Sequence, residues 1–322
     1  MKGEFMVKLN ACINEVKTFK GIVNNVVKEP VSSSVKKKAI LEKMSDEERN
    51  YYHSFVEENE LEELSLPFLK NNIYLKKVKA KLEYPRKKKL NENGIFLPKS
   101  DRLNIAYVDV YFLGLNNRFY TVITTSNKTW VNRIKNLIGS ENFIVNDDLD
   151  IDNDIFNWLM YLYEERNGNI SEKLKIENIS GFVGNIADDT NVFSGNSNQT
   201  TELTVTKAFI SNGGELKKVG TRIRHDEIID IIFFIDHKSN ISIDCVSSID
   251  LILLNGVNTQ LGKEVYYMLY IYCYLINELK KRYAVESKEF MNTKKRAFSK
   301  KIGLEVIKSI MIENGIELNE LK

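Results

Sequence analysis

Hydrophobic and polar residues alternate most regularly in residues 73–84. The alternation places Val78, Ala80, Leu82 and Tyr84 on one side, and Lys77, Lys79, Lys81 and Glu83 on the other. Because successive side chains of a strand point to opposite faces, this period of two predicts a half-buried β-strand with a basic outer face.

Other strand-like segments lie in two groups. Residues 105–113 and 118–125 are separated by a four-residue connection, which predicts an antiparallel hairpin. Residues 216–224, 228–236 and 241–246 predict a three-strand meander. Its middle strand is apolar on both faces, so we expect it to be central and covered on both sides.

Helical patterns fill most of the remaining chain. We predict helices in residues 35–64, 152–166, 201–210, 260–283 and 287–314, and a further helix that carries Trp130, Ile134, Leu137 and Ile138. Ser45 followed by Glu48 has capping-box spacing. Ser126 or Asn127 is the candidate cap of the helix that carries Trp130, and Gly139 is its expected end. Residues 188–199 are rich in Asn, Asp, Ser and Gly and predict a loop.

Strands grouped with strands indicate an α+β fold. We expect an antiparallel or mixed sheet, made of the hairpin and the meander, with a helical N-terminal region and C-terminal helices. The corresponding division is a helical region at 1–66, an α+β domain at 67–190, and the meander with its helices at 191–322.

Composition is that of an ordinary soluble protein. The 322 residues are 43% hydrophobic and 28% charged, with a net charge of +2. Three widely spaced cysteines, Cys12, Cys245 and Cys273, indicate a reducing compartment. The longest apolar run, residues 265–276, is shorter than the roughly 20 residues that span a bilayer. We therefore expect a cytoplasmic protein without a membrane partner.

The small net charge conceals strongly charged blocks. Residues 70–102 contain eleven basic and three acidic residues, and residues 280–301 contain nine and two. Residues 42–63 contain nine acidic and two basic residues. Lysines on a strand face, next to a basic loop, suit electrostatic contact with a phosphate backbone. The alternative is that the acidic segment packs beside the basic face and neutralises it.

The predicted nucleic-acid contacts form two stripes. The first contains Lys77, Lys79, Lys81, Arg86, Lys87, Lys88 and Lys89, and the second contains Lys218, Arg222 and Arg224. Tyr74, Tyr84 and Phe96 are available to stack on bases. A separate aromatic stripe, Tyr266, Tyr270 and Tyr274, has i, i+4, i+8 spacing and predicts either a protein interface or core packing.

Catalytic and metal-binding patterns are weaker. Glu215 and Lys217 have the Glu-x-Lys spacing of metal-dependent nucleases, with Asp188 and Asp189 upstream. The acidic run at 147–154 fits a helix cap better than a calcium loop. The three histidines, His53, His225 and His237, are too few for most imidazole centres, and the two in predicted turns are expected to be solvated. We expect neither metal nor cofactor.

These patterns favour a non-enzymatic protein that binds DNA or RNA through basic segments within a bacterial assembly. The abundance of Lys, Asn and Ile is compatible with a low-GC bacterium or its phage, and a phage-defence assembly is one setting considered. Two alternatives stay open. One is a metal-dependent nuclease, and the other is an oligomeric or partner-bound scaffold without nucleic acid.

Overall fold

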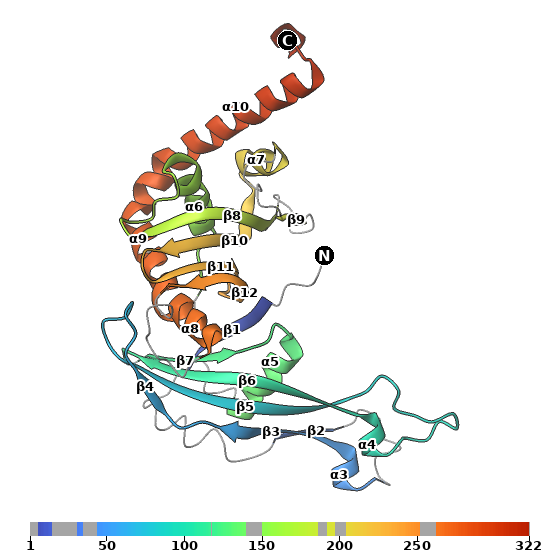
Figure 1. Ribbon diagram of the computed structural model, residues 1–322. Coiled ribbons are helices and arrows are strands. Elements are labelled where there is room, and N and C mark those ends of the chain that lie inside the picture. Colours follow the sequence, from blue (N-terminus) through green and yellow to red (C-terminus); the bar gives the residue numbers. More distant parts are fainter. Residues whose placement is uncertain are drawn as a thin grey trace. The chain divides into compact units, whose positions relative to one another are not determined.

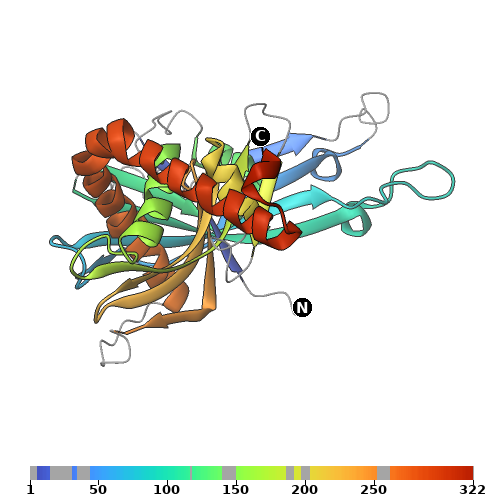
Figure 2. The ribbon, with the colours of Figure 1, turned by 90° about the horizontal axis from the view of Figure 1, so that it is seen from above.

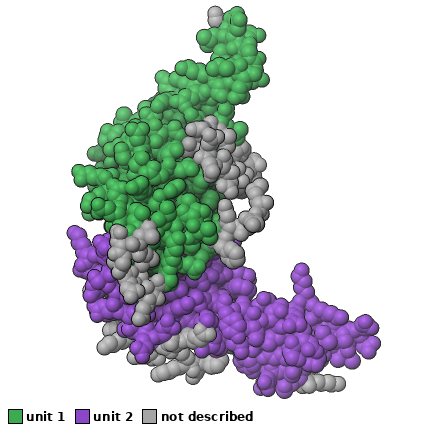
Figure 3. Space-filling model, viewed as in Figure 1, with its two compact units in different colours: residues 1–7, 150–322 green, residues 8–149 purple. Residues whose placement is uncertain are grey.

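In the computed structural model the chain forms two compact units (Figure 3). Unit 2 comprises residues 8–149, and unit 1 comprises residues 1–7 with 150–322. The structure describes residues 6–14, 31–34, 44–116, 118–139, 150–185, 192–196, 204–251 and 262–321. The division near residue 150 differs from the boundaries after residues 66 and 190 that the sequence pattern suggests.

Unit 2 is built on an antiparallel sheet in the order β2-β3-β5-β6-β7-β1, with β4 also pairing β5 (Figure 1). Its strands are β1 (Met6–Asn14), β2 (Val31–Ser34), β3 (Asn50–Glu58), β4 (Glu62–Leu64), β5 (Ile73–Pro85), β6 (Leu103–Leu115) and β7 (Arg118–Ile123). The helices are α3 (Asp46–Arg49), α4 (Lys99–Arg102) and α5 (Lys128–Ile138).

The core of unit 2 lies between α5 and one face of the sheet. The alternating apolar residues of β5 face this helix together with those of β6, and Val131, Ile134 and Ile138 project from α5. Asn127 caps the helix by accepting from the amides of Thr129 and Trp130. Burying a large aliphatic side chain contributes about 1.5–3 kcal/mol. A one-residue shift in strand pairing would turn these side chains to the other face of the sheet, so their burial fixes the register.

Unit 1 has a second antiparallel sheet in the order β12-β11-β10-β8-β9. Its strands are β8 (Leu174–Asn185), β9 (Val192–Asn196), β10 (Glu215–His225), β11 (Ile229–Asp236) and β12 (Ile241–Asp250). The apolar middle strand of the predicted meander, β11, pairs on both sides as expected.

The helices of unit 1 are α6 (Asn153–Glu165), α7 (Thr204–Ser211), and a continuous C-terminal run with a short 3₁₀ turn, η5 (Leu318–Leu321), after it. The run contains α8 (Lys263–Leu269), η3 (Tyr270–Leu275), α9 (Ile276–Glu289), η4 (Phe290–Lys294) and α10 (Lys295–Asn314). The segments η3 and η4 widen to π-helical turns without ending the helix.

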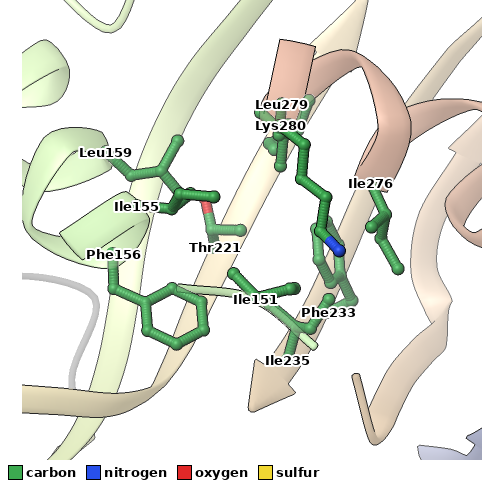
Figure 4. Close-up of a pocket in the computed structure, with 11 residues that line it drawn as sticks. Ile151, Ile155, Phe156, Leu159, Thr221, Phe233, Ile235, Ile276, Leu279 and Lys280 are labelled. Atoms are coloured by element: carbon green, nitrogen blue, oxygen red, sulfur yellow. The ribbon is translucent and has the colours of Figure 1, made fainter. Parts of the chain in front are cut away.

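The helices α6 and α9 pack on one face of this sheet. Ile155 and Leu159 of α6, Phe233 of β11 and Ile276 of α9 surround a small apolar gap (Figure 4). Its volume is about 10 Å³. That is the space of at most one water molecule, so the gap is a packing defect in the core and holds no ligand.

The α+β class is confirmed, as are the hairpin, the meander, α5, α6, α7 and the helical C-terminal third. In the described part of the chain, no helix is long and apolar enough to cross a membrane.

Three predictions were wrong in detail. The expected helix in residues 35–64 begins outside the described segments. From residue 44 onward its helical part is α3, capped by Ser45, and β3 and β4 follow. Tyr51 and His53 on β3 are buried, because sheet pairing overrides the helical propensity of the surrounding glutamates. The expected loop at 188–199 contains β9, and its other residues lie outside the described segments. The two expected C-terminal helices are one.

Candidate nucleic-acid interface

The β5–β6 hairpin extends beyond its two strands as a narrow ribbon, residues 86–102, which we call the basic ribbon. Twelve residue pairs join β5 to β6, and the backbone pairing resumes at the bridge between Leu90 and Phe96. The amide of Leu97 donates to Lys89 O over 2.9 Å. Figure 2 shows this loop projecting away from the strands at the end of the hairpin. The ribbon is therefore a two-stranded extension with its own hydrogen bonds.

The tip of the basic ribbon is a tight turn. The side-chain oxygen of Asn91 accepts from the amides of Asn93 and Ile95 over 3.0 and 2.9 Å. Gly94 has φ of +72°, a conformation that a side chain would strain. The turn reverses the chain in few residues, and Glu92, Asn93 and Ile95 at its tip are exposed.

Lys87, Lys88 and Lys89 lie on the ribbon just before this turn and are exposed. Within the described ranges, no acidic group, ring or hydrogen-bond acceptor pairs with any of the three ammonium groups. Arg86 is also exposed, but its Nε donates to Leu103 O over 2.8 Å and so ties the two sides of the ribbon together. Three adjacent cations are thus presented without neutralisation.

A buried arginine holds the base of the basic ribbon. Arg102 is 0% exposed, and its guanidinium donates to Leu97 O, to the Tyr51 hydroxyl and to the Glu48 carboxylate over 2.9, 3.0 and 3.0 Å. It also donates to Glu48 O. The Lys99 amide donates to the same carboxylate over 2.9 Å. These bonds join α3, β3 and the ribbon into one rigid base.

A second ion pair lies beside the first. Glu83 of β5 accepts from Lys99 Nζ over 2.8 Å and from the Tyr52 amide over 3.0 Å. Burial alone would raise the pKa of Glu83, but Lys99, the Tyr52 amide and nearby Lys81 together hold that pKa below its usual value. The carboxylate stays ionised and clamps α4 to the strands.

The outer face of β5 and β6 carries the remaining predicted cations. Lys77 pairs with Asp109 over 2.7 Å, which neutralises it. Lys79 lies opposite Asp109, and Lys81 lies opposite Tyr107. Tyr107 is 59% exposed, and it is not among the aromatic residues predicted to stack on bases. Its place on the outward side of the alternating pattern of β6 is the signal that would have identified it as a base-stacking candidate.

The three aromatic residues that the sequence offered for stacking lie elsewhere. Tyr74 is exposed, but it is on the opposite face of β5 from Lys77. Tyr84 packs against Trp130 with ring centroids 5.9 Å apart. Phe96 lies under the Arg102 guanidinium at 5.8 Å. Tyr84 therefore stabilises the core, and Phe96 stabilises the base of the ribbon.

The second predicted stripe is on one face of β10 in unit 1, and each of its cations has a partner. Arg222 forms a two-pronged ion pair with Asp230, at 2.8 and 2.7 Å. Arg224 lies 3.4 Å from the Asp226 carboxylate. Lys218 lies 5.3 Å from the centre of the Phe234 ring.

A polar hollow of about 480 Å³ lies along this stripe. It is lined by Tyr163, Glu177, Asn178, Arg222, Arg224 and Asp230. Two carboxylates and two guanidinium groups share the lining, and Glu177 itself pairs with Lys175 over 3.2 Å. The hollow is therefore close to neutral, unlike the basic ribbon.

The tyrosine stripe of the C-terminal helix is mostly buried. Tyr266 and Tyr270 are 1% and 0% exposed, and Tyr274 is half-buried. His225 lies against the same helix, with Nδ1 3.1 Å from the Tyr270 hydroxyl and its ring stacked on Tyr274. Core packing, the alternative interpretation, accounts for this geometry.

The expectation of a solvated His225 was wrong. Its side chain is buried, and burial is the main reason that its pKa lies below the usual value, with Lys173 acting in the same direction. His53 lies on β3 and is also buried, with its pKa lowered mainly by burial and then by Arg133. His237 is half-buried beside the carbonyl of Lys217.

The acidic residues of the predicted nuclease motif do not form a metal-binding cluster in the described part of the chain. Glu215 is exposed at the start of β10, and its carboxylate accepts a hydrogen bond from the side-chain Nδ2 of Asn153. Asp188 and Asp189 lie outside the described residues. Across the described segments, no group of three or more His, Cys, Asp or Glu side chains is placed to hold a metal ion. In the acidic run, Asp152 caps α6, Asp150 pairs with Lys238, and Asp154 pairs with Lys295.

The geometry therefore separates the candidate residues into an unneutralised basic ribbon and a charge-balanced strand. Comparison with known proteins adds no assignment, because no protein-family model matches the chain and no curated protein has a matching sequence.

Proposed function

We propose that this protein binds nucleic acid through the basic ribbon, and that it does so without catalysing a reaction. The observation that carries the proposal is the set of three exposed lysines, Lys87, Lys88 and Lys89, which have no partner among the described groups. Unpaired cations gain the most from a phosphate backbone, because their binding releases condensed counterions and breaks no existing ion pair.

The shape of the ribbon supports the same proposal. A two-stranded β-ribbon fits within the major groove of B-form DNA, and phosphate contacts position a protein without reading the sequence. The rigid base formed by Arg102, Glu48, Lys99 and Glu83 lowers the entropy that the ribbon loses on binding. Lys81 and Tyr107 extend the surface along the outer face of the strands.

The direct test is a fluorescence-anisotropy titration of labelled duplex and single-stranded DNA or RNA with the full chain. The triple variant Lys87→Glu, Lys88→Glu, Lys89→Glu should bind at least about tenfold more weakly at low salt. The matched control is Lys128→Glu, Lys173→Glu, Lys308→Glu, which changes the net charge equally at exposed sites outside the ribbon. It should bind within about twofold of the parent protein.

Equal losses in the two triple variants would show that net charge alone drives binding, and no loss in the ribbon variant would remove the proposal.

The nuclease alternative has a separate test. Incubation with plasmid and Mg²⁺ or Mn²⁺ should leave the DNA intact. Cleavage that is abolished by Glu215→Ala would contradict the non-enzymatic part of the proposal.

A further inference from the structure

Helix α10 has two apolar faces, and unit 1 covers one of them. Phe298, Ile302 and Val306 are buried, and the helix packs on α7 and α6 (Figure 1). Two polar contacts fix this orientation. Ser309 Oγ lies 3.1 Å from the Thr204 hydroxyl, and Glu305 accepts from Lys207 Nζ over 2.7 Å. The rotation of the helix about its axis is thereby settled.

The opposite face carries an apolar stripe, which we call the outer stripe: Leu304, Ile307 and Met311. These residues have the i, i+3, i+7 spacing of one helix face. Leu304 and Ile307 are 50% and 48% exposed, and neighbouring Ile310 is 42% exposed. Anchors with this spacing are the pattern by which one amphipathic helix binds another protein element.

The charges around the outer stripe have one sign. Arg296, Lys300 and Lys308 are exposed, and in the described part of the chain none of them forms an ion pair or hydrogen bond. The acidic residues of α10 are directed elsewhere. Glu305 is held by Lys207 on the covered side, and Glu313 accepts from Ser309, which contacts α7. The exposed side of α10 is consequently apolar along the outer stripe, with Lys300 and Arg296 one and two turns before it on the same face and Lys308 beside it.

These charges restrict what can cover the outer stripe. A second copy would bring the same basic residues against themselves, because no acidic residue of α10 lies on this side. Nucleic acid would match the basic residues but would leave Leu304, Ile307 and Met311 without an apolar partner. An amphipathic helix with an apolar stripe and acidic residues next to it satisfies both features.

We propose that the outer stripe of α10 binds an acidic amphipathic helix of a partner protein. The apolar residues of the two helices interdigitate, Arg296 and Lys300 pair with carboxylates at one end of the partner's apolar stripe, and Lys308 pairs with a carboxylate beside it. This interface is on unit 1 and is independent of the nucleic-acid proposal, which rests on unit 2. A protein with both surfaces would connect nucleic acid to another protein.

The test uses the full chain and two labelled model peptides. Both peptides form helices with leucines at i, i+3, i+4 and i+7, and they differ only in having Glu or Lys at the flanking positions. The variant Leu304→Gln, Ile307→Gln removes the exposed apolar centre without touching the buried face. The control Val246→Gln, Val285→Gln alters two other exposed apolar residues, which are 75% and 82% exposed.

We expect the acidic peptide to bind the parent and the control equally, and to bind at least about tenfold more weakly to the Leu304→Gln, Ile307→Gln variant. The Lys-flanked peptide should bind at least about tenfold more weakly to the parent. Equal binding of both peptides would overturn the proposal. So would binding to anionic phosphatidylglycerol vesicles in place of the peptide, or a parent dimer in light scattering that the Gln variant dissociates.

Discussion

The basic ribbon of unit 2 and strand β10 of unit 1 both carry closely spaced cations, but they differ in how those cations are paired: among the described residues, Lys87, Lys88 and Lys89 have no carboxylate partner, whereas Arg222 and Arg224 each have one. On β10, Arg222 is bound by Asp230 of the neighbouring strand. On the ribbon, Lys87, Lys88 and Lys89 precede a turn that no strand of the described part of the chain adjoins. Residues across a sheet lie about 5 Å apart, so a strand inside a sheet can balance its charges whereas a hairpin tip cannot.

The largest difference in stability between the two units should appear when one arginine is removed from each. Arg102→Ala should lower the free energy of unfolding of unit 2 by about 2–4 kcal/mol, because it leaves the Tyr51 hydroxyl and Glu48 groups without their buried donor. Arg222→Ala should lower the free energy of unfolding of unit 1 by less, about 1–2 kcal/mol, since Arg222 is 41% exposed although its removal leaves the buried Asp230 carboxylate without its partner.

Each unit contains one tryptophan, Trp130 in unit 2 and Trp158 in unit 1, so urea unfolding can be followed in each unit separately. The measurements would be made in Trp158→Phe and Trp130→Phe backgrounds respectively, each compared with its own parent. Equal losses for the two arginine variants would contradict the difference in burial on which the comparison depends.

The pH dependence of the ribbon base should also differ from that of unit 1. The pKa of Glu83 lies below its usual value in the folded protein, so its stabilising effect is present above the unfolded pKa and disappears as pH falls through the folded pKa. Glu83→Gln should therefore cost about 1–2 kcal/mol near neutral pH and progressively less in acid.

The matched variant in unit 1 is Glu177→Gln on β8, whose partner Lys175 is about half exposed. It should cost less than about 0.5 kcal/mol at neutral pH. Urea midpoints measured between neutral and acid pH would test both. A constant difference between Glu83→Gln and its parent across this range would show that the Glu83 charge does not stabilise the ribbon.

A smaller effect should distinguish the two faces of the hairpin. Tyr107→Ala should weaken single-stranded DNA binding by about 1 kcal/mol, roughly fivefold, if this exposed ring stacks on a base beside Lys81. Tyr74→Ala removes a ring that is 42% exposed on the opposite face and should have no effect. An equal loss of DNA affinity in the two variants would contradict the prediction that the nucleic acid binds the face that carries Tyr107 and Lys81.

Sequence periodicity predicted β5, β6, β7 and the meander because one or both faces of these strands are buried in a core, and buried faces require apolar side chains. It failed at β3, where Tyr51 and His53 are buried by pairing with β5 although glutamates surround them. It also gave no signal for β8, whose alternation is interrupted by bulges opposite β10. Both strands form because they pair with strands that lie further along the chain, β3 with β5 and β8 with β10.

The candidate site was predictable only in part. The run Arg86–Lys89 is evident in the sequence, and the exposure of its lysines follows from the turn beside it. Charge balance on β10 was not predictable, because Arg222 and Asp230 meet only after β10 and β11 pair in one register. The burial of Arg102 was equally hidden, since its partners Tyr51 and Glu48 come from β3 and α3.

The salt dependence of nucleic-acid binding tests the central distinction most directly. The logarithm of the binding constant falls linearly with the logarithm of salt concentration, with a slope of about 0.9 per phosphate neutralised on duplex DNA. Replacing Lys87, Lys88 and Lys89 with Gln should reduce the magnitude of this slope by about 2–3. Replacing Arg222 and Arg224 with Gln should change it by less than about 0.5, because their charges are already paired with Asp230 and Asp226. The opposite result, an unchanged slope for the ribbon variant and a reduced slope for the β10 variant, would contradict the assignment of the interface to the basic ribbon.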